Sequence, residues 1–286
     1  MKKIILLLAV VIILIGIITN VFLWQKGNEQ VEQLEPVQKE KISEPNEFLQ
    51  LQGEIKKPEI RYPVPDIQVQ SEVIEEEVIE PEEKEEPLPE LDESDDIIKE
   101  IFNSLFENQQ FTELFLFNAF VRHFVVTIDN MTSQKLPQRF TFTKKPAGKF
   151  MVQKMDNDNA LLDPENYDRY TPFVSFVDVL DNRKLVSVYV RYYPLFQKAY
   201  EDLGYPDRYF NDRLIEVIDH LLETPDVQGT VKLLQPKVFY TFADPDLEAL
   251  TAGQKILIRI GSDNAVKVKA KLRVLRQELI SLAVRD

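Results

Sequence analysis

An uncharged apolar stretch at residues 4–24 constrains the architecture of this chain more than any other feature. Its only polar members are Thr19 and Asn20. A helix rises about 1.5 Å per residue, so this stretch is long enough to cross the roughly 30 Å hydrocarbon layer of a bilayer. A cleaved secretory signal has a shorter apolar core and a small-residue cleavage site, which the following residues do not supply. We therefore expect residues 1–25 to form an uncleaved signal anchor with one transmembrane helix.

The charges that flank this stretch predict its orientation. Lys2 and Lys3 precede it, whereas the residues that follow soon become acidic. Positive charges remain preferentially on the cytoplasmic side of a membrane. We therefore expect the N-terminus in the cytoplasm, residues 4–24 in the lipid bilayer of the cell inner membrane, and the rest of this single-pass protein in the periplasm.

Residues 26–90 have the composition of a disordered linker. Residues 1–90 contain 9 Lys and Arg against 19 Asp and Glu, a net charge of −10, whereas residues 91–286 have a net charge of only −4. The segment "EVIEEEVIEPEEKEE" at 72–86 is almost entirely acidic, and prolines recur throughout. Such a sequence buries too little apolar surface to offset the entropy lost on folding. We expect a solvated spacer, with an acidic binding tail as the alternative.

Composition also argues against several classes of function. The formal net charge of −14 disfavours nucleic acid as a partner, because phosphate contacts need clustered Lys and Arg. The chain has no cysteine, which removes disulfides, thiol nucleophiles and cysteine zinc sites. It contains no G-x-S-x-G elbow, phosphate-binding loop, G-x-G-x-x-G fingerprint or H-E-x-x-H motif. We therefore expect no cofactor and no metal, and the sequence identifies no catalytic residue.

Residues 91–286 have the pattern of one globular domain, which we expect to be α+β and mainly α. Apolar residues recur at helical spacing in several stretches, and alternation around Pro146 predicts a small β-hairpin. Asn211 and Ser262 are candidate helix caps. The expected helices are at 94–106, 111–128, 182–203, 214–222, 247–260 and 263–282, with a further one ending near 180, and the expected hairpin pairs 140–144 with 149–154.

Tyrosine and arginine, which are enriched at binding surfaces, concentrate between residues 167 and 210. Tyr189 and Tyr192 fall on an apolar stripe with spacings of three and four residues, so we expect them to pack in the core. The remaining tyrosines and arginines lie mainly in two loops, "NYDRY" and "GYPDRYF". If these loops meet, the candidate binding surface consists of Tyr167, Arg169, Tyr170, Tyr193, Tyr205 and Arg208.

Two functions remain open. A long tether joined to a domain without catalytic motifs favours a non-enzymatic binding or scaffolding protein of the cell envelope, with a protein or a cell-wall polymer as partner. The alternative is a hydrolase of envelope polymers that uses carboxylates or His220, which has Glu216 one helical turn before it. The basic face of the last helix indicates a solvated surface, with an anionic partner as the alternative.

Several blocks of this sequence resemble one bacterial family, the domain-of-unknown-function family numbered 3014. The blocks are "LPELDESD" (88–95), "RHFVVTIDN" (122–130), "NYDRYTPFV" (166–174), the segment 193–225 and the segment 242–265. The resemblance covers most of the chain after residue 88. It implies a membrane anchor, a variable linker and then this domain, and it implies no catalytic or ligand residues.

Overall fold

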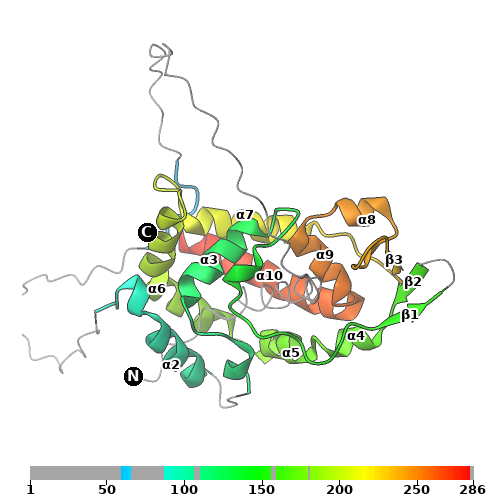
Figure 1. The fold of residues 1–286 in the computed structure, drawn as a ribbon. Helices are drawn as coiled ribbons and strands as arrows, with labels where there is room; N and C mark the ends of the chain where they lie inside the picture. Colours follow the sequence, from blue (N-terminus) through cyan, green and yellow to red (C-terminus); the bar gives the residue numbers. More distant parts are fainter. Residues whose placement is uncertain (1–58, 66–86, 106–109, 156–158, 180, 284–286) are drawn as a thin grey trace, which may run out of the picture.

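The computed structural model describes residues 59–65, 87–105, 110–155, 159–179 and 181–283. These residues form a mostly helical domain with a small antiparallel sheet at one end (Figure 1). The expected α+β, mainly α class is therefore confirmed. The helices are α2 (Asp95–Leu105), α3 (Phe120–Asn130), α4 (Glu165–Asp168), α5 (Thr171–Val179), α6 (Asn182–Asp202), α7 (Phe210–Leu222), α8 (Pro245–Ala249), α9 (Ala252–Arg259) and α10 (Ser262–Leu282).

The core lies between α3, α6, α7 and α10. The Phe124 ring of α3 packs edge to face against the Phe196 ring of α6, with 5.4 Å between the ring centroids. Its centroid lies 6.2 Å from that of Phe210 in α7. Helix α10 packs against α5, α6, α7 and α9 and buries one side, including Leu272 and Leu275. Because an aromatic pair adds about 0.5–1.5 kcal/mol to the burial of its apolar area, this cluster fixes how the three helices meet.

The sheet forms a second, smaller apolar unit. Its strands are β1 (Val152–Lys154), β2 (Asn159–Leu162), β3 (Lys232–Leu234) and β4 (Thr241–Phe242), which pair antiparallel in the order β1-β2-β3-β4. Ala160 lies opposite Leu233, which in turn lies opposite Phe242. These buried side chains pack with Ile258 of α9, so the sheet is joined to the helical part through α9.

The predicted pairing of 140–144 with 149–154 is wrong. The backbone near Phe142 pairs instead with residues 114–116: the Leu116 N–H donates to the Phe142 carbonyl at 2.8 Å, and the Lys144 N–H donates to the Leu114 carbonyl at 2.8 Å. Phe142 is fully buried against Phe120 and Phe124. The burial of this ring in the helical core determines which backbone partner the segment meets.

The predicted helix at 111–128 is interrupted. Residues Thr112–Leu114 form a short 3-10 turn, and α3 begins only at Phe120. Ala119 adopts a left-handed backbone with φ of 48°, and Asp95 of α2 accepts hydrogen bonds from the Ala119 N–H at 2.7 Å and the Phe120 N–H at 2.8 Å. A carboxylate from a different helix therefore starts α3, and local apolar spacing gives no sign of it.

We expect Asp95→Ala to destabilise the domain by about 1–2 kcal/mol, because two N–H groups at the start of α3 lose their acceptor. Urea unfolding of the full-length chain measures this change. Asp96→Ala is the matched control, since Asp96 is the next residue in the first turn of α2. Equal losses in the two variants would contradict the capping role of Asp95.

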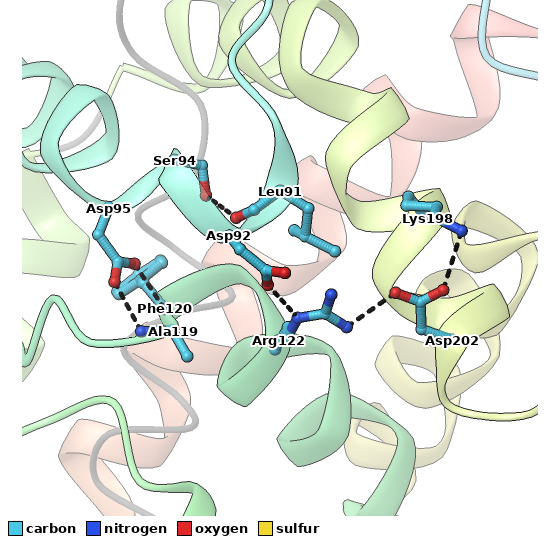
Figure 2. A network of polar contacts seen from close by, with 9 residues as sticks. All are labelled: Leu91, Asp92, Ser94, Asp95, Ala119, Phe120, Arg122, Lys198 and Asp202. Carbon is cyan, nitrogen blue, oxygen red and sulfur yellow. Dashed lines mark hydrogen bonds and ion pairs between the residues drawn. The ribbon is translucent and has the colours of Figure 1, made fainter.

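A chain of ion pairs on the surface joins the 3-10 turn Leu91–Glu93, which precedes α2, to α3 and α6 (Figure 2). The Arg122 guanidinium lies 2.8 Å from Asp92 and 2.8 Å from Asp202, and Asp202 also pairs with Lys198 at 3.0 Å. The hydrogen bonds from Lys198 and Arg122 lower the pKa of Asp202. Exposed pairs of this kind contribute little to stability individually.

His123 is a partly buried histidine on α3, and its Nδ1 atom has no hydrogen-bond partner among the described residues. Burial lowers its pKa, which favours the neutral ring in the folded state. The unfolded chain therefore binds more protons as pH falls below the ordinary value of about 6.5. We therefore expect the free energy of unfolding to fall as the pH drops from about 6.5 towards the lower pKa of the folded state. His123→Gln should reduce this fall, and urea unfolding at pH 7.5 and at pH 5.5 measures it. An unchanged pH dependence would contradict this role of burial.

The predicted membrane anchor at 4–24 lies outside the residues that the structure describes. Within those residues, no helix is long and apolar enough to span a bilayer. Two parts of the predicted linker are described, residues 59–65 and 87–90. Residues 59–65, which we call the strap, lie beside the loop that joins α6 to α7 (Figure 1).

Candidate functional site

The strap is held at the start of α7 by hydrogen bonds to its main chain. The Asp212 carboxylate accepts from the Arg61 N–H at 3.0 Å and from the Tyr62 N–H at 2.8 Å. The Asn211 amide donates to the Tyr62 carbonyl at 2.9 Å. Two adjacent side chains of α7 thus bind three main-chain groups, while Tyr62 and Val64 pack against the main core. Hydrogen bonds to a charged acceptor are among the stronger ones in proteins.

Asn211 is pre-oriented for this contact. It is fully buried, and the Tyr189 hydroxyl donates to its Oδ1 at 3.1 Å. Burial raises the pKa of Tyr189 well above its usual value, so this hydroxyl remains a donor. With the amide oxygen accepting from Tyr189, the Asn211 nitrogen faces the strap and donates to the Tyr62 carbonyl.

Asn211 does not cap α7, so the sequence-based assignment of the cap is wrong. Gln197 of α6 holds the start of this helix instead: its Oε1 accepts from the Phe210 N–H at 2.9 Å and from the Tyr193 hydroxyl at 2.9 Å. Its Nε2 donates to the Arg208 carbonyl at 2.9 Å. Since Gln197 binds the helix start and the preceding loop, Asn211 is available to bind the strap.

A second set of contacts anchors α7 to α3. Arg213 pairs with Asp129 at 2.9 Å and donates to the Thr132 hydroxyl at 2.8 Å. The Tyr205 hydroxyl donates to the other oxygen of Asp129 at 3.2 Å, and the charge of Asp129 raises the pKa of Tyr205. The side chains of Arg213 and Asp129 are both largely buried, which keeps this pair weakly screened. These contacts hold the start of α7 against α3, and we call residues 211–213 the α7 platform.

Two clefts border the strap, with volumes of about 430 Å³ and about 380 Å³. Arg61, Asp212, Arg213 and Glu216 line both of them. The larger cleft extends to the loop between α6 and α7, and the smaller one extends along α7. The other lining residues are Glu59, Ile60, Tyr200, Asp207, Arg208 and Tyr209 in the larger cleft and Tyr62, Thr132, Ile215, Asp219, His220 and Glu223 in the smaller one.

The structure places the six predicted binding residues in two different parts of the molecule. Tyr205 and Arg208 lie in the loop between α6 and α7, whereas Tyr167 lies in α4 near the sheet, at the other end of the domain (Figure 1). Tyr170 is 2 % exposed and Tyr193 is 9 % exposed, so both are core residues. The six residues do not form one exposed surface.

Arg169 and Tyr167, the predicted binding residues near the sheet, make contacts that stabilise the fold. Arg169 donates to the Ala147 carbonyl at 2.8 Å and to the Gly148 carbonyl at 3.4 Å, which holds the loop before β1. The Tyr167 ring packs in the second apolar cluster beside Gly261. In the other half, Arg208 is exposed and lines the larger cleft, with its guanidinium 5.6 Å from the Tyr205 ring centroid.

His220 lies in the smaller cleft, close to acidic residues. Its Nε2 atom is 2.9 Å from the Thr251 hydroxyl, and Thr251 caps α9 together with Gln254. Asp212 is engaged with the strap, and Asp219 pairs with Arg276. The described part of the chain contains no group of three or more His, Asp or Glu arranged to hold a metal ion. His220 therefore has an evident structural contact, although the cleft does bring it near carboxylates.

Residues 120–276, more than half of the chain, match a family described as protein of unknown function (DUF3014). The chain belongs to this family. Searches of curated proteins and of solved structures gave no match. The DUF3014 match confirms the family indicated by the sequence blocks, but it begins at Phe120, so the block at 88–95 lies outside it.

Only one side of the contact between the strap and α7 lies within the DUF3014 match. Asn211, Asp212 and Arg213 lie within the matched residues, whereas the strap lies before them. Asp92 and Asp95 also precede the match and yet contact α3 directly. The folded unit therefore extends beyond the matched residues, and the α7 platform is part of the matched domain.

Asn211 and Asp212 were not predicted as binding residues, because both fit the start of a helix. One signal could have indicated the strap: Tyr62 is the first tyrosine of the chain and stands in "IRYPVP", within a linker that is otherwise rich in acidic residues. An aromatic residue between prolines is unusual for a solvated spacer.

Proposed function

We propose that this chain is a non-enzymatic binding or scaffolding protein of the cell envelope. In this proposal, residues 4–24 anchor it in the inner membrane, a disordered linker follows, and the domain works in the periplasm. The observation that carries the proposal is the α7 platform, where Asn211 and Asp212 hold the strap by its main chain between two clefts. A surface of this kind supports recruitment of a protein partner.

The electrostatics of the platform support binding rather than catalysis. Arg213 is neutralised by Asp129, and the Asp212 carboxylate is occupied by two N–H donors. The side chains of Asp129 and Arg213 are each less than a fifth exposed and pair with each other, so their positions are set before a partner arrives. Pre-organised groups lower the cost of ordering an interface.

Site-directed photocrosslinking in intact cells tests this proposal. A photoreactive residue at position 216 stands in both clefts, and one at the exposed position 237 stands in the loop between β3 and β4 as the matched control. We expect adducts with an envelope protein from position 216 that disappear with Asp212→Ala, and no such adducts from position 237. Identical adduct patterns from the two positions, or none from 216, would contradict the proposal.

The proposed topology has its own test. A reporter that is active only after export, fused after Asp286, should be active in cells that carry the full-length chain. Activity only from a reporter that requires the cytoplasm would overturn the periplasmic location. Replacing three residues of the apolar stretch 4–24 with aspartate should release the chain from the membrane fraction.

A hydrolase of envelope polymers is the second candidate function. The observation that favours it is the smaller cleft, which places His220 with Glu216 and Glu223. It predicts that the purified chain releases soluble fragments from isolated cell-wall polymer and that His220→Ala abolishes this release. Absence of any release by the wild-type chain would end this alternative, whereas release lost in His220→Ala would replace the binding proposal.

A further inference from the structure

The strap has the chemistry of a short peptide ligand. Its sequence from residue 60 is "IRYPVP", in which Pro63 and Pro65 have no N–H and restrict the residues before them to extended backbone. Tyr62 and Val64 are therefore stiffened before they bind, which reduces the entropy lost on docking. Both side chains pack against the main core, while the Arg61 side chain is 60 % exposed.

The receptor side of this contact binds main-chain groups of the strap, whose backbone bends at Arg61 and Tyr62. Asp212 takes the two adjacent N–H groups that precede the first proline, and Asn211 takes the carbonyl of Tyr62. Main-chain groups give such a site its affinity, and the pockets for alternate side chains give its selectivity. Here the selective positions are those of Tyr62 and Val64, because their side chains reach the core.

We propose that the α7 platform is a receptor for proline-containing peptides of the pattern tyrosine–proline–aliphatic–proline, and that the strap is its intramolecular ligand. A partner protein that presents such a segment displaces the strap and takes the same hydrogen bonds from Asn211 and Asp212. This inference rests on the proposed binding function and names the class of ligand that the same site takes.

Because the strap competes for the same site, it sets the affinity that a partner needs in order to bind. A segment tethered to its own site by a short linker has an effective concentration of about 1 mM. If the strap sequence binds with an intrinsic Kd of about 100 μM, the docked strap raises the apparent Kd of an external peptide of equal intrinsic affinity about tenfold. The docked strap therefore excludes weak ligands and leaves the site to tight or clustered ones.

A fluorescent peptide with the sequence of residues 57–67, "KPEIRYPVPDI", tests the inference by anisotropy with the full-length chain. Arg61→Pro in the protein removes one strap N–H and leaves the α7 platform unchanged. We expect the peptide to bind this variant about tenfold more tightly than it binds the wild-type chain. Adding Asp212→Ala should abolish binding, and a control peptide with alanine in place of its tyrosine should bind at least tenfold more weakly.

Failure of the peptide to bind the folded Arg61→Pro chain would overturn the inference, as would unchanged binding after Asp212→Ala. Equal affinity for the wild-type and Arg61→Pro chains would show that the strap does not compete. A chain in which Gly-Ser repeats replace residues 59–65 repeats the comparison with no strap at all. If the peptide binds but position 216 gives no crosslinks in cells, the peptide-receptor proposal stands and the proposed envelope function is refuted. If position 216 gives crosslinks but the peptide does not bind, only the peptide-receptor proposal is refuted.

Discussion

Replacing Gly261 with alanine will lower the free energy of unfolding by about 2–5 kcal/mol, because backbone strain and overpacking act together at this position. Gly261 has a φ of 89° and connects α9 to α10. A Cβ atom placed there would lie 2.6 Å from Cγ of Tyr167. The Tyr167 ring cannot retreat easily, since it packs in the apolar cluster beneath the sheet and its carbonyl accepts from Asn264.

Gly229→Ala is the matched control for this prediction. Gly229 also has a positive φ, 79°, but an added Cβ would contact nothing within 4 Å. We expect the free energy of unfolding of this variant to fall by only about 1–2 kcal/mol, the cost of placing a residue with a Cβ atom in a left-handed backbone. Urea unfolding of both variants measures the difference. Equal losses would show that the clash of the added Cβ atom with the Tyr167 ring contributes nothing to the destabilisation.

Replacing Asn211 with leucine will destabilise the chain by about 1–3 kcal/mol, the cost of leaving the buried Tyr189 hydroxyl without an acceptor. Leucine has a similar size, so lost packing contributes little. The Tyr62 carbonyl also loses its donor, but this group can bind water once the strap lifts away. The free energy of unfolding and protease cleavage near residue 62 report these two effects separately.

A double-mutant cycle isolates the role of Tyr189. Tyr189→Phe alone leaves the Asn211 oxygen unpaired, whereas Tyr189→Phe with Asn211→Leu removes both members of the buried hydrogen bond. We expect the double variant to be more stable than the sum of the single losses by about 1 kcal/mol or more. Additive losses would show that Tyr189 does not orient Asn211.

Helices with a regular apolar stripe could be predicted from the sequence, because their burial depends on local spacing. The stripe through Tyr189, Tyr192 and Phe196 gave α6 almost to the residue, and the predicted burial of both tyrosines is confirmed. The same reasoning joined residues 111–128 into one helix. That prediction failed because Asp95, far away in sequence, binds the N–H groups of Ala119 and Phe120.

The binding platform could not be predicted because it depends on contacts between distant residues. Asp212 and Arg61 are 151 positions apart, and nothing near Asp212 distinguishes it from an ordinary acid in the first turn of a helix. Likewise, composition grouped Tyr167 with Tyr205, but α4 and the loop after α6 pack in different parts of the fold. Residue type indicated binding, whereas only the tertiary arrangement shows which residues meet.

Hydrogen exchange at the Arg61 and Tyr62 amides tests the central claim most directly, which is that the α7 platform holds the strap by its main chain. Each amide donates to a carboxylate, and such a bond contributes about 1.5–3 kcal/mol, so we expect exchange slowed about tenfold or more in the wild-type chain. Asp212→Ala should remove this protection, whereas Glu216→Ala, on the same face of α7, should leave it intact. Fast exchange in the wild-type chain, or protection that survives Asp212→Ala, would contradict the account.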